Sequence, residues 1–369
     1  MKKILLFLTT LLPLAVQAQV TDGYYRIQNY ASTRYITITD DIVGEVNKSS
    51  GDADLTNITT WRGFDHVKSN PASIIYVEQV GSQYNLKAQG TSIYQIAGGR
   101  TYLDLIAREN NSYVLSITYK GVSGRLFDTT KDVDKGSVRN KKTESGYDQW
   151  CFIPVTDGDN YIGLQPTVQI GNDWYGTIYA SYPFKLASSG ITVYIVDGAK
   201  DGMFQLQEIT DEVKPASTPL LFKCSSNDPA QNKVLPVTDA TTRPDNNLLA
   251  GTLFASTEVD HEEYVTYDKK TMRVLGKNDA GELIFTTAST DYLTSKKYIP
   301  ANTCYLNLTS GASGDYKLVD RGTYTGIRSI EANTSSAAAK ATYTLTGVRV
   351  DNPTTPGIYI KDGKKIVIK

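Results

Sequence analysis

Short stretches of β-branched and aromatic residues, separated by clusters of Gly, Asn and Asp, run along most of this chain. Such stretches are typical of β-strands joined by turns, and no long segment has the periodicity of an amphipathic helix. The pattern therefore predicts an all-β protein. In the first half the predicted strands are 24–28, 34–39, 74–80, 84–87, 113–119 and 149–155. In the second half they are 174–180, 191–196, 203–209, 220–224, 247–256, 264–267, 272–275 and 282–287.

The chain is long for one domain and predicts two, at residues 19–157 and 158–322. In the second domain, Asn278-Asp279-Ala280-Gly281 predicts a hairpin turn. Residues 214–220 and 299–306 share the motif Pro-Ala-x-Thr before an apolar run. This repeat indicates a duplicated turn that starts a strand, because a proline at a strand start loses no needed N–H bond. We expect this domain to be β-sandwich-like.

Residues 20–157 contain a weak repeat. Residues 23–27 read Gly-Tyr-Tyr-Arg-Ile, residues 102–104 read Tyr-Leu-Asp, and residues 149–150 read Gln-Trp. These motifs resemble the Gly-x-Tyr-x-Ile, Lys-Tyr-Leu-Asp and Gln-x-Trp motifs of ricin-type β-trefoil lectins. The family separates the closing Gln and Trp by one residue, whereas here they are adjacent. The resemblance implies a β-trefoil-like domain of three units at residues 19–157.

That resemblance also implies a sugar site. In such a site an Asp accepts hydrogen bonds from sugar hydroxyls, an aromatic ring stacks on the apolar sugar face, and an Asn or Gln completes the network. Asp104 matches the family's Tyr-Leu-Asp, and Asp128 is a second candidate, but the two are less than one repeat apart and cannot both be equivalent. Tyr102 and Trp61 are the candidate rings, and a place in the core is the alternative for Trp61.

The first residues have the features of an export signal. Lys2 and Lys3 precede an apolar run at 4–14, and Val16-Gln17-Ala18 suits signal peptidase. We expect cleavage between Ala18 and Gln19, which makes residues 1–18 a signal peptide. The apolar run is shorter than the roughly 20 residues of a membrane span, and no later stretch is apolar enough, so no span is predicted.

The last residues resemble a sorting signal. Residues 323–340 have few large apolar side chains and predict a linker. Residues 341–369 contain Tyr343, Leu345 and Gly347, then Gly357-Ile358-Tyr359-Ile360 and a lysine-rich end. This order resembles the short C-terminal sorting domain of type IX secretion cargo. The resemblance implies export and sorting machinery as partners, and a location that is secreted or attached to the outer membrane or cell surface. A terminal β-hairpin of the core is the alternative.

Charge and cysteine content narrow the possible functions. The chain has 38 basic and 39 acidic residues, so it has no general attraction for nucleic acid or anionic membranes. Of its three cysteines, Cys224 and Cys304 are the best candidates for a disulfide, and buried free thiols are the alternative. The 25 Tyr suit both half-buried strands and sugar-binding surfaces.

No catalytic motif stands out. The only histidines are His66 and His261, and neither belongs to a zinc or nucleophile motif. Asp128, Asp132 and Asp134 only partly match a calcium loop. We therefore expect no catalytic residue, bound metal or cofactor. The favoured function is a non-catalytic carbohydrate-binding or adhesion protein that recognises a glycan or another host or extracellular surface ligand. The alternatives are a glycan-directed hydrolase, with two carboxylates in one cleft, and a structural or protease-inhibitory surface protein.

Overall fold

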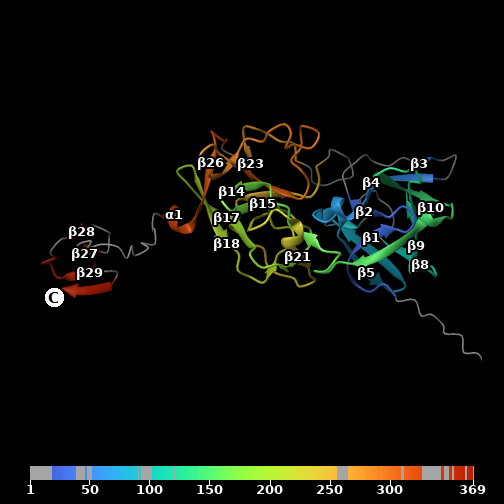
Figure 1. The fold of residues 1–369 in the computed structure, drawn as a ribbon, viewed down its shortest axis with the longest axis horizontal. Coiled ribbons are helices and arrows are strands. Elements are labelled where there is room, and N and C mark those ends of the chain that lie inside the picture. The colour runs from blue at the N-terminus through green and yellow to red at the C-terminus, as the bar shows by residue number, and fades with distance from the viewer. Residues whose placement is uncertain are drawn as a thin grey trace, which may run out of the picture. The chain divides into compact units, whose positions relative to one another are not determined.

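The computed structural model is almost entirely β-strand and turn, as the sequence predicts (Figure 1). It describes residues 19–38, 46–47, 52–89, 91–92, 102–119, 121–255, 265–308, 311–325, 342–344, 349–350, 353–361 and 364–368. The predicted signal peptide at 1–18, most of the predicted linker at 323–340, and His261 lie outside these residues. The chain divides into two compact units, 1–325 and 326–369. No helix in the described part is long and apolar enough to cross a bilayer.

Within the described residues, six strands of the first half form a closed barrel. Each of the six pairs with the next in antiparallel fashion, and the last pairs with the first. In ring order they are β1 (Gly23–Asn29), β5 (Ile75–Val80), β6 (Gln83–Ala88), β8 (Tyr102–Ala107), β9 (Tyr113–Tyr119) and β12 (Gln149–Pro154). Closure leaves the ring without an exposed sheet edge.

The other strands of this half form hairpins beside the barrel. They are β2 (Arg34–Ile38), β3 (Val46–Asn47), β4 (Asp52–Arg62), β7 (Thr91–Ser92), β10 (Val122–Asp128) and β11 (Lys135–Lys141). Strand β2 pairs with β4, β10 pairs with β11, and a β4–β11 pairing joins the two hairpins. A six-stranded barrel with such hairpins is trefoil-like. Short 3-10 turns connect these strands: η1 (Phe64–His66), η2 (Pro71–Ser73) and η3 (Gly146–Asp148).

The barrel encloses one hydrophobic core. Its largest fully buried side chain is Trp150 of β12, whose indole N–H donates to the carbonyl of Leu126. Strand alternation explains the rest of the core, because residues one apart point to opposite faces. On β8, for example, Leu103 is 1% exposed and packs inward, whereas Tyr102 is 41% exposed.

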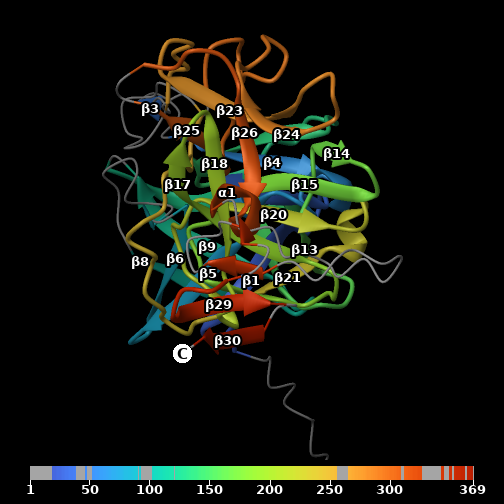
Figure 2. The same cartoon turned by 90° about the vertical axis from the view of Figure 1, so that its left-hand side faces the viewer.

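In the described residues of the second half of the first unit, from β13 to α1, the strands form two sheets. The smaller sheet has the order β13 (Ile162–Gly163), β21 (Lys233–Pro236), β16 (Phe184–Leu186) and β19 (Val213–Lys214). The larger has the order β14 (Val168–Ile170), β15 (Asp173–Ile178), β20 (Leu220–Cys224), β17 (Thr192–Lys200), β18 (Met203–Glu208), β26 (Tyr316–Asp320), β24 (Leu283–Thr286), β23 (Met272–Lys277), β25 (Thr303–Asn307) and β22 (Leu249–Thr252). Figure 2 shows β26 beside β18, and this pair is parallel. The turn η4 (Pro229–Gln231) precedes β21, and the helix α1 (Arg321–Thr325) follows β26.

Strand β20 is buried on both faces. Leu220 and Phe222 pack with Phe184 of the smaller sheet in one core, while Leu221 packs in a second core formed within the larger sheet. This accounts for the unbroken apolar run at the start of β20, since a strand covered on both faces does not alternate. Packing of the two sheets across the first core is the sandwich-like arrangement that the sequence predicts.

The repeated Pro-Ala-x-Thr motif forms the same turn twice. Ser217 and Asn302 occupy equivalent positions in the motif, and both have left-handed backbone conformations, with φ of 50° and 58°. The backbone N–H of each donates to a carbonyl of another strand or loop, Ala180 for Ser217 and Thr252 for Asn302. Strands β20 and β25 then begin within three residues. The predicted duplicated turn is confirmed.

Two buried polar networks join the halves of the first unit. Gln89 and Asn302 exchange amide hydrogen bonds of 2.9 and 3.0 Å, and Gln89 also donates to the carbonyl of Leu253. Arg26 of β1 donates to Asn160 and to the carbonyl of Tyr161, as well as to Ser73. Burial lowers the pKa of Arg26 to about 10, which leaves it charged at neutral pH.

The C-terminal unit is a small antiparallel sheet in the order β28 (Arg349–Val350), β27 (Thr342–Thr344), β29 (Gly357–Lys361) and β30 (Lys364–Ile368). Lys361 pairs with Lys364, so a two-residue connection joins the last two strands. Strands β29 and β30 therefore form an antiparallel hairpin.

All three cysteines are free thiols. The Cys224 thiol donates to the carbonyl of Ser226, and the buried Cys304 thiol donates to the carbonyl of Ile178. The disulfide suggested for these two cysteines is therefore not formed, and both serve as small buried side chains.

Candidate functional site

The structure brings three of the residue types of a sugar site together on the outward face of β8. Tyr102 and Asp104 are two positions apart on this strand and therefore point to the same side. Both are exposed. Gln83, at the start of the neighbouring β6, donates from Nε2 to Asp104 Oδ1 over 3.1 Å. We call Gln83, Tyr102 and Asp104 the Asp104 cluster.

The Asp104 cluster can bind polar groups from solvent. Gln83 is the one hydrogen-bond partner that the described residues give to the carboxylate, and it leaves Oδ2 open to accept from a ligand hydroxyl. Leu103 and Leu105 pack on the barrel core and fix the orientation of the strand. Tyr102 is an exposed aromatic residue on the same face of β8 as Asp104, and Ser116 of β9 lies directly opposite Asp104.

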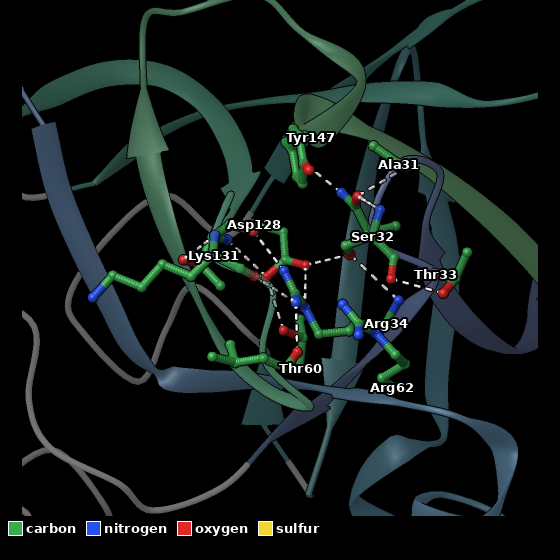
Figure 3. Close-up of polar contacts among 12 residues, drawn as sticks. Ala31, Ser32, Thr33, Arg34, Thr60, Arg62, Asp128, Lys131 and Tyr147 are labelled. Atoms are coloured by element: carbon green, nitrogen blue, oxygen red, sulfur yellow. Dashed lines mark hydrogen bonds and ion pairs between the residues drawn. The ribbon is translucent and has the colours of Figure 1, made fainter.

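Asp128, the second candidate acceptor, lies in a different environment. It is fully buried, at 0% exposure, and forms an ion pair of 2.9 Å with the equally buried Arg34 (Figure 3). Its oxygens also accept hydrogen bonds from the hydroxyls of Ser32 and Thr60 and from the backbone N–H of Thr129. The carboxylate is thus saturated by internal donors, and its position indicates a role in holding the fold.

The segment that partly resembled a calcium loop encloses Arg34. The Arg34 guanidinium donates to the carbonyls of Thr129, Lys131 and Val133. These carbonyls, together with the Asp128 carboxylate, are oxygen groups of the kind that bind Ca²⁺. Here they converge on the protein's own cation (Figure 3). In the described part of the chain, no three His, Cys, Asp or Glu side chains are grouped to hold a metal ion.

Trp61 is half-buried near the end of β4. Strand β4 pairs with β2, β3 and β11, whereas β8 pairs with β6 and β9, so Trp61 is not on a strand next to the Asp104 cluster. Its ring stacks on the imidazole of His66, with centroids 4.9 Å apart and an angle of 22°. The ammonium of Lys135 lies 5.6 Å from the ring centroid. The ring is therefore engaged within the protein, although part of it reaches solvent.

Two hollows in the described part of the surface are lined without Asp or Glu. One of about 430 Å³ and another of about 540 Å³ are present, and neither has an Asp or Glu in its wall. The paired carboxylates that a glycoside hydrolase needs are therefore not found in either hollow.

Comparison with known proteins gives few matches. No protein-family model matches the sequence, and no curated protein matches it at a significant level. Among solved structures, a designed three-fold symmetric protein, ThreeFoil, aligns with 36% of this chain and 99% of its own length. The two are 13% identical, and the TM-score is 0.25.

Sequence reasoning did not single out Gln83 or Arg34. Gln83 follows the turn at Gly81, and only the pairing of β6 with β8 brings it to Asp104. Arg34 is the first residue of β2 and follows a turn, where a charged residue is expected to be exposed. Its ion-pair partner Asp128 is 94 positions away in the sequence and allows Arg34 to be buried in the core. No pattern in the residues around Arg34 indicates that partner.

Proposed function

We propose that this protein is a non-catalytic carbohydrate-binding protein that uses the Asp104 cluster as its sugar site. The proposal is supported chiefly by one observation: an open carboxylate, an amide side chain and an exposed aromatic ring lie on the same outward face of the trefoil-like barrel. This is the combination that binds vicinal hydroxyls and the apolar face of a pyranose. The ricin-type motif around Asp104 supports the same function.

The binding chemistry follows from the individual groups. Asp104 accepts hydrogen bonds from two neighbouring sugar hydroxyls, and these bonds are stronger than neutral ones because the acceptor is charged. The Gln83 amide orients the carboxylate, and its own oxygen is open to accept from a third hydroxyl. The Tyr102 ring covers the C–H face of the sugar, which excludes water from the hydrogen bonds. The site is shallow, so we expect weak affinity for single sugars and stronger binding of polymers through several contacts.

The test is binding of the mature chain to a glycan array and to insoluble polysaccharides, with affinities then measured by calorimetry for whichever glycan binds. Asp104→Ala should weaken binding about 10- to 100-fold, because it removes charge-assisted hydrogen bonds. Tyr102→Ala should weaken it by up to about tenfold. Asp132→Ala is the matched control, since Asp132 is a highly exposed carboxylate outside the cluster, and it should bind as wild type. Absence of binding throughout the panel, or full binding by Asp104→Ala, contradicts the proposal.

We further propose that the protein acts on the cell surface or after release from the cell. The predicted signal peptide at 1–18 and the likeness of residues 341–369 to type IX sorting domains support this location. Recovery of the polypeptide in the cytosol with Met1 intact contradicts it.

A further inference from the structure

A cavity of about 430 Å³ lies where the two halves of the first unit meet. One wall comes from the trefoil-like half, at Ile38 and residues 69–72. The other walls come from the second half, at 162–165, 167, 177–178, 292 and 301–303 among others. The volume falls within the range of pockets that enclose small ligands, about 300–1,000 Å³. We call this space the seam cavity.

The lining of the seam cavity is uncharged. It includes no Asp, Glu, Lys, Arg or His, and its polar side chains are amides and hydroxyls, such as Asn70, Gln165 and Thr167. Burial raises the pKa of Tyr292, so this phenol is neutral at physiological pH. A charged ligand would lose its hydration here without gaining a counter-charge. The lining therefore selects a neutral ligand.

Ser69 supplies an unused hydrogen-bonding group. It lines the cavity, and its hydroxyl oxygen is buried with no hydrogen-bond partner among the described residues. Buried hydroxyls are almost always paired, because an unpaired one has lost its water without replacement. Rotation of the Ser69 side chain would turn this hydroxyl into the cavity, where a hydroxyl-bearing molecule would satisfy it. Ile162, Ile178 and Phe222 add apolar surface to the same lining.

The walls are held in place before any ligand binds. Asn302 lines the cavity while its amide bonds Gln89 of the other half and the carbonyl of Tyr179. Asn70 accepts from the backbone N–H of Ala72 and fixes the turn η2. A pre-formed pocket avoids the cost of ordering loops on binding.

We propose that the seam cavity is a second ligand site, which binds one neutral monosaccharide. The ligand class rests on the proposed carbohydrate function, while the site itself is separate from the Asp104 cluster. A neutral pyranose matches the lining because it carries several hydroxyls and an apolar C–H face and has no charge. The recessed site would recognise a free sugar or chain end, whereas the Asp104 cluster faces the outside of the barrel.

The experiment is ligand-observed NMR followed by calorimetry, on the full mature chain, with D-glucose, D-galactose, D-mannose, N-acetyl-D-glucosamine and the anionic D-glucuronate. At least one neutral sugar should bind, and glucuronate should not. Ala301→Leu, which fills the cavity, should weaken binding more than tenfold. Ser69→Ala should weaken it by up to about tenfold through loss of one hydrogen bond.

Ser313→Ala alters an exposed serine and should bind as wild type. Thermal melting of each variant identifies any that does not fold, and Ser69→Ala keeps the test decisive if Ala301→Leu misfolds.

The outcomes separate the two sites. If no neutral sugar binds with a Kd below about 10 mM, or if both Ala301→Leu and Ser69→Ala bind as wild type, the seam cavity holds only water and this inference is wrong. That result leaves polysaccharide binding through Asp104 untouched. If monosaccharide binding depends on Ser69 while Asp104→Ala has no effect on any glycan, the seam site stands and the Asp104 proposal fails.

Discussion

The buried pair of Arg34 and Asp128 shows how one residue can organise a loop. Arg34 bonds the Asp128 carboxylate and three carbonyls of the segment that follows it. Two charges are costly to bury, and the cost is offset only when hydrogen bonds satisfy both partners. Here the Arg34 guanidinium donates to the carboxylate and to three carbonyls, and the Asp128 carboxylate also accepts from two hydroxyls and a backbone N–H, so protein groups satisfy both charges. The pair therefore fixes the path between β10 and β11.

Loss of the Asp128 carboxylate should be strongly destabilising. Asp128→Ala leaves the Arg34 guanidinium buried without its counter-charge, and the free energy of unfolding should fall by about 3–5 kcal/mol. Urea denaturation at pH 7 measures this change. Asp132→Ala removes an exposed carboxylate from the same segment and should have little effect. Equal stability of the two variants would show that the buried pair has no structural role.

Tyr182 gives a pH-dependent prediction. Its ring is buried, its hydroxyl has no hydrogen-bond partner among the described residues, and burial raises its pKa above the usual value of about 10. Below pH 10 both the folded and unfolded states keep the proton, so stability does not depend on it. Above pH 10 the unfolded state releases the proton first, and the free energy of unfolding falls as pH rises.

Tyr182→Phe should remove part of this alkaline loss. Tyr24, whose pKa burial raises to about 12, acts with the same sign and accounts for part of what remains. At pH 7 the variant should be as stable as wild type or more stable by up to about 1 kcal/mol, because the unpaired hydroxyl is gone. Urea denaturation from pH 7 to 11 tests this, with the exposed Tyr30→Phe as control. An alkaline loss as steep as that of wild type in Tyr182→Phe would contradict the assignment.

At the scale of elements, the sequence predicted strands best where one face is buried. The predicted ranges at 24–28, 34–39, 74–80, 84–87, 113–119 and 149–155 coincide with β1, β2, β5, β6, β9 and β12. Strands β4, β8, β10 and β11 were missed. Each contains Gly, Asp, Asn or Lys, which are depleted in strands, and pairing with neighbouring strands overrides that local preference.

The candidate site was predicted only in part. Asp104 and Tyr102 could be found because a local motif places them two residues apart on one strand. The same reasoning placed Asp128 in the site, yet it is a core residue, because the distant Arg34 neutralises its charge. Burial of a charged residue depends on its partner, and no pattern of neighbours in the sequence reveals the partner. The duplicated Pro-Ala-x-Thr turn was predictable because its geometry is encoded within a few residues.

At the scale of the whole molecule, the amide pair of Gln89 and Asn302 should couple the two halves. Gln89→Ala leaves buried amide groups of Asn302 unpaired and should lower the free energy of unfolding by about 1–3 kcal/mol. Asn302→Gly keeps the left-handed backbone and removes the same bonds. A double-mutant cycle measured by urea denaturation should give a coupling of about 0.5–3 kcal/mol. A coupling of zero would show that the pair does not link the halves.

The hydrophobic interiors of the two halves are also shared. Leu253 and Phe254 come from the second half but belong to the core of the barrel, whereas Ile74 and Val155 belong to the core of the second half. A genetic rearrangement that moved the barrel alone into another protein would leave part of its interior behind. The two halves therefore depend on each other to complete their interiors and form one folding unit, even though their separate sheets would suggest two exchangeable pieces.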